Sequence, residues 1–269
     1  MVEVSPPAPE EIRAGTDLSA ASVGIPQYSI GKILAVWAAA ALPMAALAWL
    51  VAPALEDELG GEGNVPMAKA LVICLTAGLI WQFVLVVILV RREQGTLRWS
   101  TVREALWLRS PQSPSSGRRG GRLWLTLIPL VLAFFVAHAL LPTPPLPENR
   151  DLGEFLDSDA GENFLSGAWG WFALIALSQI FNTVLGEELL FRGLLLPRMN
   201  DAFGRADWAA NGVLFTAYHL HVPWAMPATL LDTFILSYPT KRYRSAWIGI
   251  IVHSAQSLFI IVFVLTLVA

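Results

Sequence analysis

Residues 169–193 read WGWFALIALSQIFNTVLGEELLFRG. No charged residue occurs before the adjacent glutamates Glu187 and Glu188, and Arg192 follows four residues after Glu188. An apolar run of about 20 residues is long enough to cross the hydrocarbon core of a bilayer as a helix. Charges are costly at such a position and often mark a functional site. The stretch therefore predicts a membrane-spanning helix that carries polar chemistry at one end.

The composition agrees with a membrane protein. Of the 269 residues, 55% are hydrophobic and only 14% are charged. These residues carry more apolar surface than a soluble domain of this length would bury in its core. The single cysteine, Cys74, lies in an apolar run, which excludes an intrachain disulfide and a zinc site built from cysteines. No pattern of basic and aromatic residues indicates nucleic-acid binding.

The hydrophobic pattern predicts an all-α, polytopic membrane bundle of about seven transmembrane segments. Residues 1–28 are expected to form a flexible tail, 29–166 the N-terminal transmembrane helices, and 167–269 a second membrane domain that carries the polar chemistry. Two segments are short for independent spans, which favours broken or re-entrant helices shielded by their neighbours. The expected segments are 33–54, 67–90, 123–141, 167–196, 207–220, 225–238 and 245–269.

The charges of the connections predict the orientation. Residues 91–122 hold eight arginines and two glutamates, whereas connections 52–66 and 142–166 are acidic. Basic loops stay in the cytoplasm, so the pattern predicts a multi-pass cell-membrane protein with a cytoplasmic N-terminus. Seven crossings would place the C-terminus outside. Residues 109–122 are interpreted as an unstructured connector whose arginines could contact lipid headgroups, although a role in topology alone is the simpler interpretation.

Polar residues in the last third predict one site. Glu188 and Arg192 share a helix face and can pair, which leaves Glu187 free. A salt-bridged helix end outside the bilayer is the simplest alternative. His219 and His253 interrupt two further apolar segments, and Ser257 follows His253 by four residues. A glutamate, two imidazoles and a hydroxyl could together activate water and stabilise an oxyanion, which is the chemistry of amide hydrolysis.

Three ordered motifs carry a family resemblance. EELLFR (187–192), FTAYH (215–219) and HSAQS (253–257) resemble the pattern of the CAAX prenyl endopeptidase and bacteriocin-processing (CPBP, or Abi) intramembrane proteases. The resemblance implies that Glu187 and His219 activate water, that Glu188 and Arg192 organise the site, and that His253 completes it. It also implies a membrane-associated or lipidated peptide substrate. Ser257 stands where the pattern usually has asparagine.

The same residues admit a metal. Glu187, His219 and His253 could supply nitrogen and oxygen ligands for a catalytic zinc or another divalent ion, or they could act directly. Two non-proteolytic functions also stay open: a proton- or ion-coupled transporter, and a non-catalytic immunity or scaffold protein.

Five other polar residues have weaker interpretations. His138 and His221 are expected at the membrane interface, whereas Gln179, Asn182 and Asp232 either line the site or form hydrogen bonds between helices. One feature opposes a single site. Counted along straight spans, Glu187 lies near the inner end of its helix and His219 near the outer end of the next, so they would not meet without irregular packing.

Overall fold

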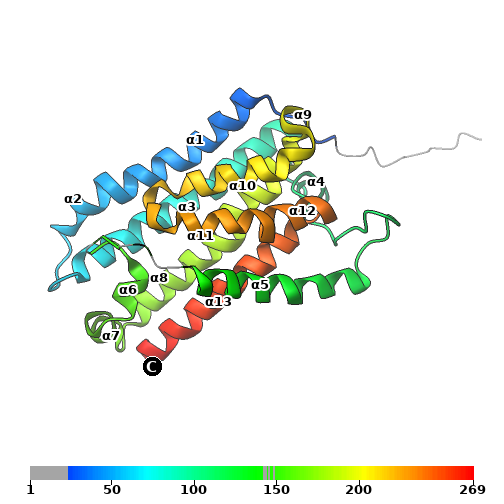
Figure 1. Cartoon of the computed structure of the whole chain (residues 1–269). Coiled ribbons are helices and arrows are strands. Elements are labelled where there is room, and N and C mark those ends of the chain that lie inside the picture. Colours follow the sequence, from blue (N-terminus) through cyan, green and yellow to red (C-terminus); the bar gives the residue numbers. More distant parts are fainter. Residues whose placement is uncertain (1–23, 142–143, 145, 148) are drawn as a thin grey trace, which may run out of the picture.

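The computed structural model describes residues 24–141, 144, 146, 147 and 149–269. Helices account for its named elements, which pack as one bundle with its axes roughly aligned (Figure 1). Within the described residues the only β-type pairing is an isolated bridge between Gln112 and Arg119. The predicted all-α class is confirmed.

Five helices are long and apolar enough to cross a membrane, judged by length and composition. Several of them combine consecutive α, π or 3₁₀ segments. The first joins α1 (Ile30–Ala46), η1 (Leu47–Val51) and α2 (Ala52–Glu56), and the second is α3 (Val65–Gln94). The third joins η2 (Gly121–Thr126) to α5 (Leu127–Leu140), the fourth runs from α8 (Trp169–Ile180) to η5 (Leu196–Arg198), and the fifth is α13 (Ala246–Val268).

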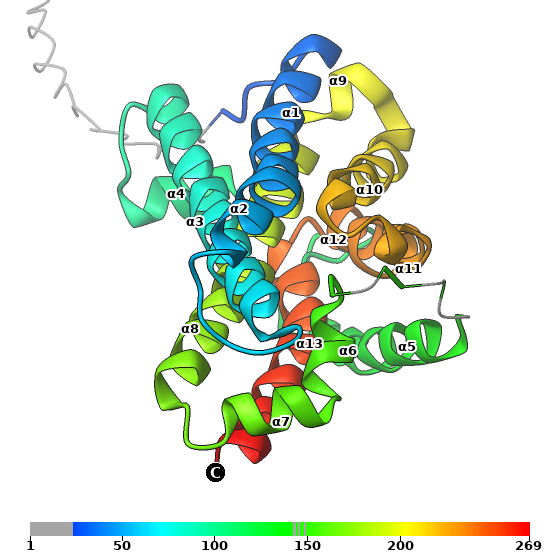
Figure 2. The ribbon, with the colours of Figure 1, turned by 90° about the vertical axis from the view of Figure 1, so that its left-hand side faces the viewer.

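The two remaining predicted segments are shorter, as the sequence indicated. One is α10 (Asp207–Tyr218), followed by η7 (His219–His221) and η8 (Pro223–Ala225). The other combines α11 (Met226–Asp232), η9 (Thr233–Ser237) and α12 (Tyr238–Tyr243). Figure 2 shows α10, α11 and α12 stacked on one side of the bundle, with α5 next to α11 and α13. Neighbouring helices thus cover one face of these short segments, whereas Val213, Leu230 and Phe234 stay exposed on the other face.

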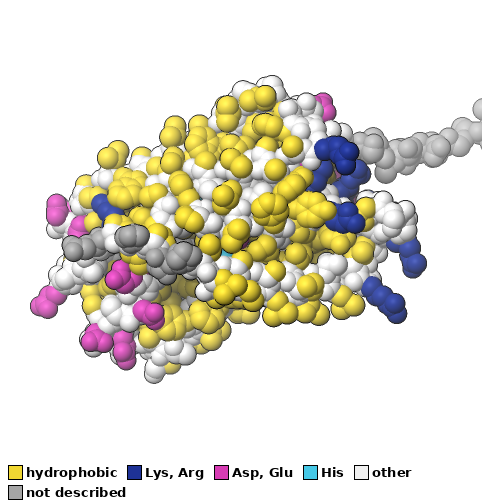
Figure 3. Space-filling view, viewed as in Figure 1, with side chains coloured by type: hydrophobic (Ala, Val, Ile, Leu, Met, Phe, Trp, Pro, Cys, Tyr) yellow, Lys and Arg dark blue, Asp and Glu magenta, His cyan; other side chains and the backbone are white. Residues whose placement is uncertain are grey.

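The two ends of the bundle carry opposite charge. Figure 3 shows acidic side chains at the end formed by α2, α6 (Leu152–Leu156) and α7 (Asp159–Leu165), and basic side chains at the other end. The described chain begins at the basic end and its C-terminus lies at the acidic end, where Gly167 N–H donates to the Val268 carbonyl. Opposite ends for the two termini are what an odd number of crossings requires.

The connector between α3 and α5 is structured, so the expectation of an unstructured segment over 109–122 is wrong. It begins with α4 (Trp99–Ala105), and Trp107 is buried in the main core. The Trp107 carbonyl accepts from the Ala246 N–H at 2.9 Å, and the Gln112 N–H donates to the Tyr243 carbonyl at 2.8 Å. These bonds attach the connector to the turn between α12 and α13.

The expected flexible tail, residues 1–28, lies mostly outside the described residues. Its last part is fixed, because Tyr28 is buried and contacts Glu93 of α3. Glu93 also accepts from buried Arg198 at 2.8 and 3.0 Å, and the Tyr28 N–H donates to the Arg198 carbonyl. Three helix ends are therefore joined at the basic end of the bundle.

Candidate active site

The helix that carries the glutamate pair departs from α geometry on both sides of it. The π-helical segment η3 (Phe181–Gly186) precedes Glu187 and Glu188, and a second, η4 (Leu189–Leu195), follows them. π turns inside α-helices are rare and frequently occur at functional sites. The local backbone therefore marks the same residues as the charge pattern does.

The depths of Glu187 and His219 agree when they are measured from the basic end. Glu187 lies eleven residues before Arg198, and His219 lies twelve residues after Asp207, where α10 begins. At about 1.5 Å per residue both lie roughly 17 Å from that end. The fourth helix runs for 30 residues, Trp169–Arg198, which is longer than the roughly 20 residues that cross the hydrocarbon core, so Glu187 does not lie at the edge of the membrane and the apparent mismatch with His219 disappears.

One cavity of about 300 Å³ receives these side chains. Glu187, His219 and His253 line it from three different helices, which fulfils the expectation of one shared site. All four histidines of the chain line the cavity. The other polar residues in its wall are Ser178, Gln179, Asn182, Thr229, Asp232 and Gln256.

Glu188 connects a guanidinium and an imidazole in the interior. Its Oε1 lies 3.1 Å from Arg192 Nη1 and 3.1 Å from His253 Nδ1, and all three residues are buried. The predicted pairing of Glu188 with Arg192 is therefore present. The guanidinium also lies 3.9 Å above the ring of Phe215, although none of its nitrogens forms a hydrogen bond of favourable geometry. The contact between Arg192 and Glu188 is thus chiefly an attraction between charges.

Gly249 allows α13 to approach the glutamate helix. A Cβ at this position would overlap Glu188 Oε2 and lie 3.2 Å from the Arg192 side chain. His253 lies one helical turn further along α13, so this close approach brings its imidazole to Glu188. A glycine is required here by space, not by backbone conformation.

Glu187 has its own set of partners. With its amide nitrogen turned towards Glu187, Asn182 donates to both carboxylate oxygens at 3.0 and 3.3 Å. The hydroxyl of buried Tyr218, the residue before His219, accepts from Gln82 Nε2 at 2.6 Å. Asn182 therefore orients the Glu187 carboxylate, and Gln82 on α3 fixes Tyr218.

The hydrogen bond of His219 determines its tautomer. His219 Nδ1 lies 2.8 Å from the Phe215 carbonyl oxygen, which can only accept, so Nδ1 carries the proton. Nε2 of a neutral imidazole is then an acceptor. It can orient a water molecule or bind a cation.

Ser257 does not line the cavity. Its hydroxyl donates instead to Gln179 Oε1 at 2.8 Å, and Gln179 does line the cavity. Because Oε1 is occupied, the other amide atom of Gln179, Nε2, is left as a donor. Ser257 thus acts on the cavity through Gln179.

His138 and His221, which were expected at the membrane interface, both line the cavity. His138 Nε2 lies 3.1 Å from Asp232 Oδ1, and His138 stacks on Phe134 with 4.4 Å between the ring centroids. His221 is buried and stacks on His219, 5.5 Å away. Although residues two apart diverge on an α-helix, these two lie in the 3₁₀ segment η7, and their rings face the same cavity.

Sequence reasoning missed Gln82, Tyr218 and Asn211. Asn211 on α10 donates to the Phe191 carbonyl at 2.8 Å and accepts from Ser237 at 3.0 Å, so it joins α10 to the glutamate helix and to η9. Gln82 and Asn211 are polar residues inside apolar helices, which is a signal of buried hydrogen bonding. Tyr218 gives no such signal, because tyrosine is common in apolar segments.

The predicted zinc ligands do not form a cluster. Glu187, His219 and His253 line one cavity, but no three His, Cys, Asp or Glu side chains among the described residues are gathered closely enough to hold a metal ion. Catalytic zinc normally has three protein ligands. The geometry therefore does not favour the zinc mechanism over direct action of these side chains, and metal analysis decides between the two.

Comparison with known proteins supports the motifs. Residues 169–259, about a third of the chain, match the family model of type II CAAX prenyl endopeptidase Rce1-like proteins. No curated protein and no solved structure matches the chain. The matched segment holds all the predicted catalytic residues, and at the level of the family it supports a CAAX-type intramembrane protease. The resemblance indicated by EELLFR, FTAYH and HSAQS is thereby confirmed, and residues 169–259 are similar to the type II CAAX prenyl endopeptidase Rce1-like proteins.

Proposed function

We propose that this protein is an intramembrane endopeptidase that uses Glu187 to activate water against a peptide bond of a membrane-associated substrate. The observation that supports it most is the convergence of Glu187, His219 and His253, from three helices, on one cavity inside the bundle. A salt-bridged helix end outside the bilayer would not place these side chains together.

The carboxylate of Glu187 acts as the general base. It accepts a proton from water while the water oxygen forms a bond to the carbonyl carbon of the substrate. The tetrahedral intermediate then collapses, the C–N bond breaks, and the proton held by Glu187 passes to the leaving amine. Water is consumed, and a carboxylate and an amine are released.

The two motif histidines have different tasks. His219 Nε2, as an acceptor, holds the second hydrogen of the water and orients its oxygen. His253 donates Nδ1–H to Glu188, so it can also donate Nε2–H to the oxyanion when the ring carries both protons. The Glu188 carboxylate stabilises that imidazolium, and Arg192 fixes Glu188.

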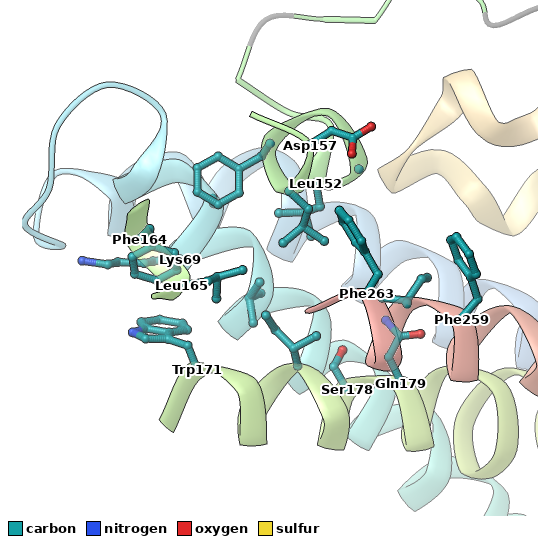
Figure 4. Close-up of a pocket in the computed structure, with 17 residues that line it drawn as sticks. Lys69, Leu152, Asp157, Phe164, Leu165, Trp171, Ser178, Gln179, Phe259 and Phe263 are labelled. Carbon is teal, nitrogen blue, oxygen red and sulfur yellow. The ribbon is translucent and has the colours of Figure 1, made fainter. Parts of the chain in front are cut away.

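A second, apolar cavity supports a substrate with an apolar chain. It measures about 430 Å³ and shares Leu152, Ser178 and Gln179 with the catalytic cavity. Figure 4 shows Ser178 and Gln179 on α8 beneath Phe259 and Phe263 of α13, with Trp171 and Phe164 further along. A lipid or apolar side chain near the scissile bond would bury its surface there, at roughly 25 cal/mol per Å².

The test uses purified protein in detergent and two fluorescence-quenched peptides, one ending in a farnesylated CAAX sequence and one unmodified. We expect cleavage of the farnesylated peptide, and a loss of at least about 100-fold in kcat in Glu187→Gln. Glu58→Gln, which removes an exposed acid far from the cavity, is the matched control.

Cleavage by the Glu187→Gln protein at the wild-type rate would contradict the proposal. Ion flux in liposomes that stops in Glu187→Gln, with no peptide cleaved by wild type, would establish the transporter instead. Equal cleavage of both peptides would support the protease activity but show that the enzyme does not recognise the farnesyl group.

A further inference from the structure

A cavity of about 520 Å³ lies at the basic end of the bundle, apart from the catalytic cavity. The connector forms one wall through Gln112, Ser113, Pro114 and Gly117, and the opposite wall is formed by residues from α9 to the turn after α12. None of these residues lines the catalytic cavity.

Four cationic side chains line this cavity: Arg205, Lys241, Arg242 and Arg244. Lys241 is paired with buried Asp207. Among the described residues, no carboxylate lies within ion-pair distance of the three arginines, which are exposed. The cavity therefore carries an excess of positive charge that the fold leaves unneutralised.

More positive charge lies directly behind the connector wall. Arg109 Nε donates to the Arg244 carbonyl at 3.2 Å, and Glu104 is its only carboxylate partner among the described residues. The pKa of Arg109 is lowered, chiefly by burial and also by the nearby charges of Arg119 and Arg244. Like charges at this spacing repel one another, and a bound anion would relieve the repulsion.

The walls are fixed before any ligand arrives. Ser245 Oγ donates to the Arg109 carbonyl at 2.5 Å, and the Gln112 N–H donates to the Tyr243 carbonyl at 2.8 Å. Arg244 ends α12 in the left-handed region, with φ of 49°, which is uncommon for a residue with a side chain. The connector and the α12–α13 turn thus hold the cavity open before a ligand binds. Binding therefore costs little conformational entropy in these walls.

The position indicates the source of the anion. Five membrane-length helices begin or end at this end of the bundle, so the cavity lies at the membrane surface. Trp208 and Tyr238 also line it, with ring centroids 5.1 Å apart. Tryptophan and tyrosine are enriched at the level of lipid headgroups.

We propose that this basic cavity binds the phosphate of an anionic phospholipid headgroup. Arg205, Arg242 and Arg244 donate to the phosphate oxygens, and the two aromatic rings lie against the glycerol and upper acyl region. The site is independent of the catalytic cavity.

The experiment is native mass spectrometry of the whole protein in detergent, titrated with phosphatidylglycerol or phosphatidylcholine. We expect retention of phosphatidylglycerol over phosphatidylcholine. Arg205→Gln/Arg242→Gln/Arg244→Gln should lower the affinity for phosphatidylglycerol on the order of 100-fold, because each arginine that donates a charge-assisted hydrogen bond to the phosphate contributes about five-fold. Arg205→Gln/Arg242→Gln, which keeps Arg244 and its left-handed backbone conformation, should lower the affinity about 25-fold.

The matched control is Arg91→Gln/Arg92→Gln/Arg98→Gln, which removes the same charge at the same end of the bundle without touching the cavity. It should bind phosphatidylglycerol as wild type does. An equal loss in the control would overturn the proposal, because binding would then follow surface charge alone. Binding of inorganic phosphate without preference for phosphatidylglycerol would also overturn it, as would unchanged binding in the double variant.

Discussion

His253 on α13 contacts Glu188 on the glutamate helix, with 3.1 Å between Nδ1 and Oε1. The same carboxylate oxygen lies 3.1 Å from Arg192 Nη1. Glu188 therefore lies between the imidazole of His253 and the guanidinium of Arg192, and only Glu187 of the glutamate pair lines the cavity. Two adjacent acids thus have separate tasks: Glu188 orders the helices, and Glu187 is left for chemistry.

Arg192→Ala is expected to lower both folding yield and activity. Glu188 is fully buried, and removal of its arginine leaves a buried carboxylate without that partner, at a cost of about 3 to 5 kcal/mol. Thermal unfolding in detergent measures the loss, and Arg91→Ala at an exposed position is the control. A variant with wild-type stability and full cleavage would show that the pair contributes nothing.

Metal removal separates the two mechanisms for water activation. Because the predicted ligands are not gathered into a cluster, we expect protein treated with a chelator to keep its activity and to hold far less than one zinc per chain. Elemental analysis and peptide cleavage on the same sample check this. About one zinc per chain, lost in His219→Ala and His253→Ala together with activity, would establish the metal-assisted alternative.

The sequence predicted the helical class, the spans and the main site residues because their signals are local. Long apolar runs show the helices, and charged residues inside such runs are too costly to be accidental. The meeting of Glu187 and His219 was not predictable by counting from an assumed bilayer edge, since the helix of Glu187 extends to Arg198 at the basic end.

Other features depend on tertiary contacts that no local pattern encodes. The connector is rich in Ser, Pro and Gly and therefore resembles a flexible loop, but its backbone bonds to the α12–α13 turn and buried Trp107 order it. His138 comes to the cavity only because α5 packs beside α11, where Asp232 is its partner.

Tyr28 gives a stability change with pH. The pKa of Tyr28 is raised above its usual value of 10.0, chiefly by burial and also by the hydrogen bond to Glu93. A group with a raised folded-state pKa stabilises the fold fully below its unfolded pKa and loses that contribution as pH rises above it. We expect the stability advantage of wild type over Tyr28→Phe, about 2 kcal/mol, to hold at neutral pH and to shrink above pH 10.

Denaturant unfolding of both proteins at several pH values measures that difference. If the difference in free energy of unfolding between wild type and Tyr28→Phe stays constant from pH 8 to about 11, ionisation of Tyr28 is not linked to folding.

Topology reporters test the orientation. Basic connections stay in the cytoplasm, so a reporter inserted near Ser115 should give a cytoplasmic signal. Because the C-terminus lies at the opposite end of the bundle, a reporter fused after Ala269 should give the opposite signal. Two signals from the same side would contradict the fold, whereas a reversal of both would contradict only the charge rule.

The last prediction concerns the serine that stands in the place of asparagine. Ser257 donates to Gln179 Oε1, which leaves the Gln179 amide N–H groups as donors in the wall of the catalytic cavity. If this amide supports the oxyanion, Gln179→Met should lower kcat roughly 100-fold with little change in KM, because an oxyanion donor acts in the transition state. Ser257→Ala should produce a smaller loss in kcat, since the amide stays but is no longer held. Cleavage kinetics of the farnesylated peptide supply both constants. The control is Asn211→Ala, which loosens the packing of the helices without changing the cavity wall and should lower thermal stability instead of kcat. An unchanged kcat in Gln179→Met would mean that Gln179 only joins α8 to α13. A loss of stability large enough to explain the whole fall in kcat would mean the same.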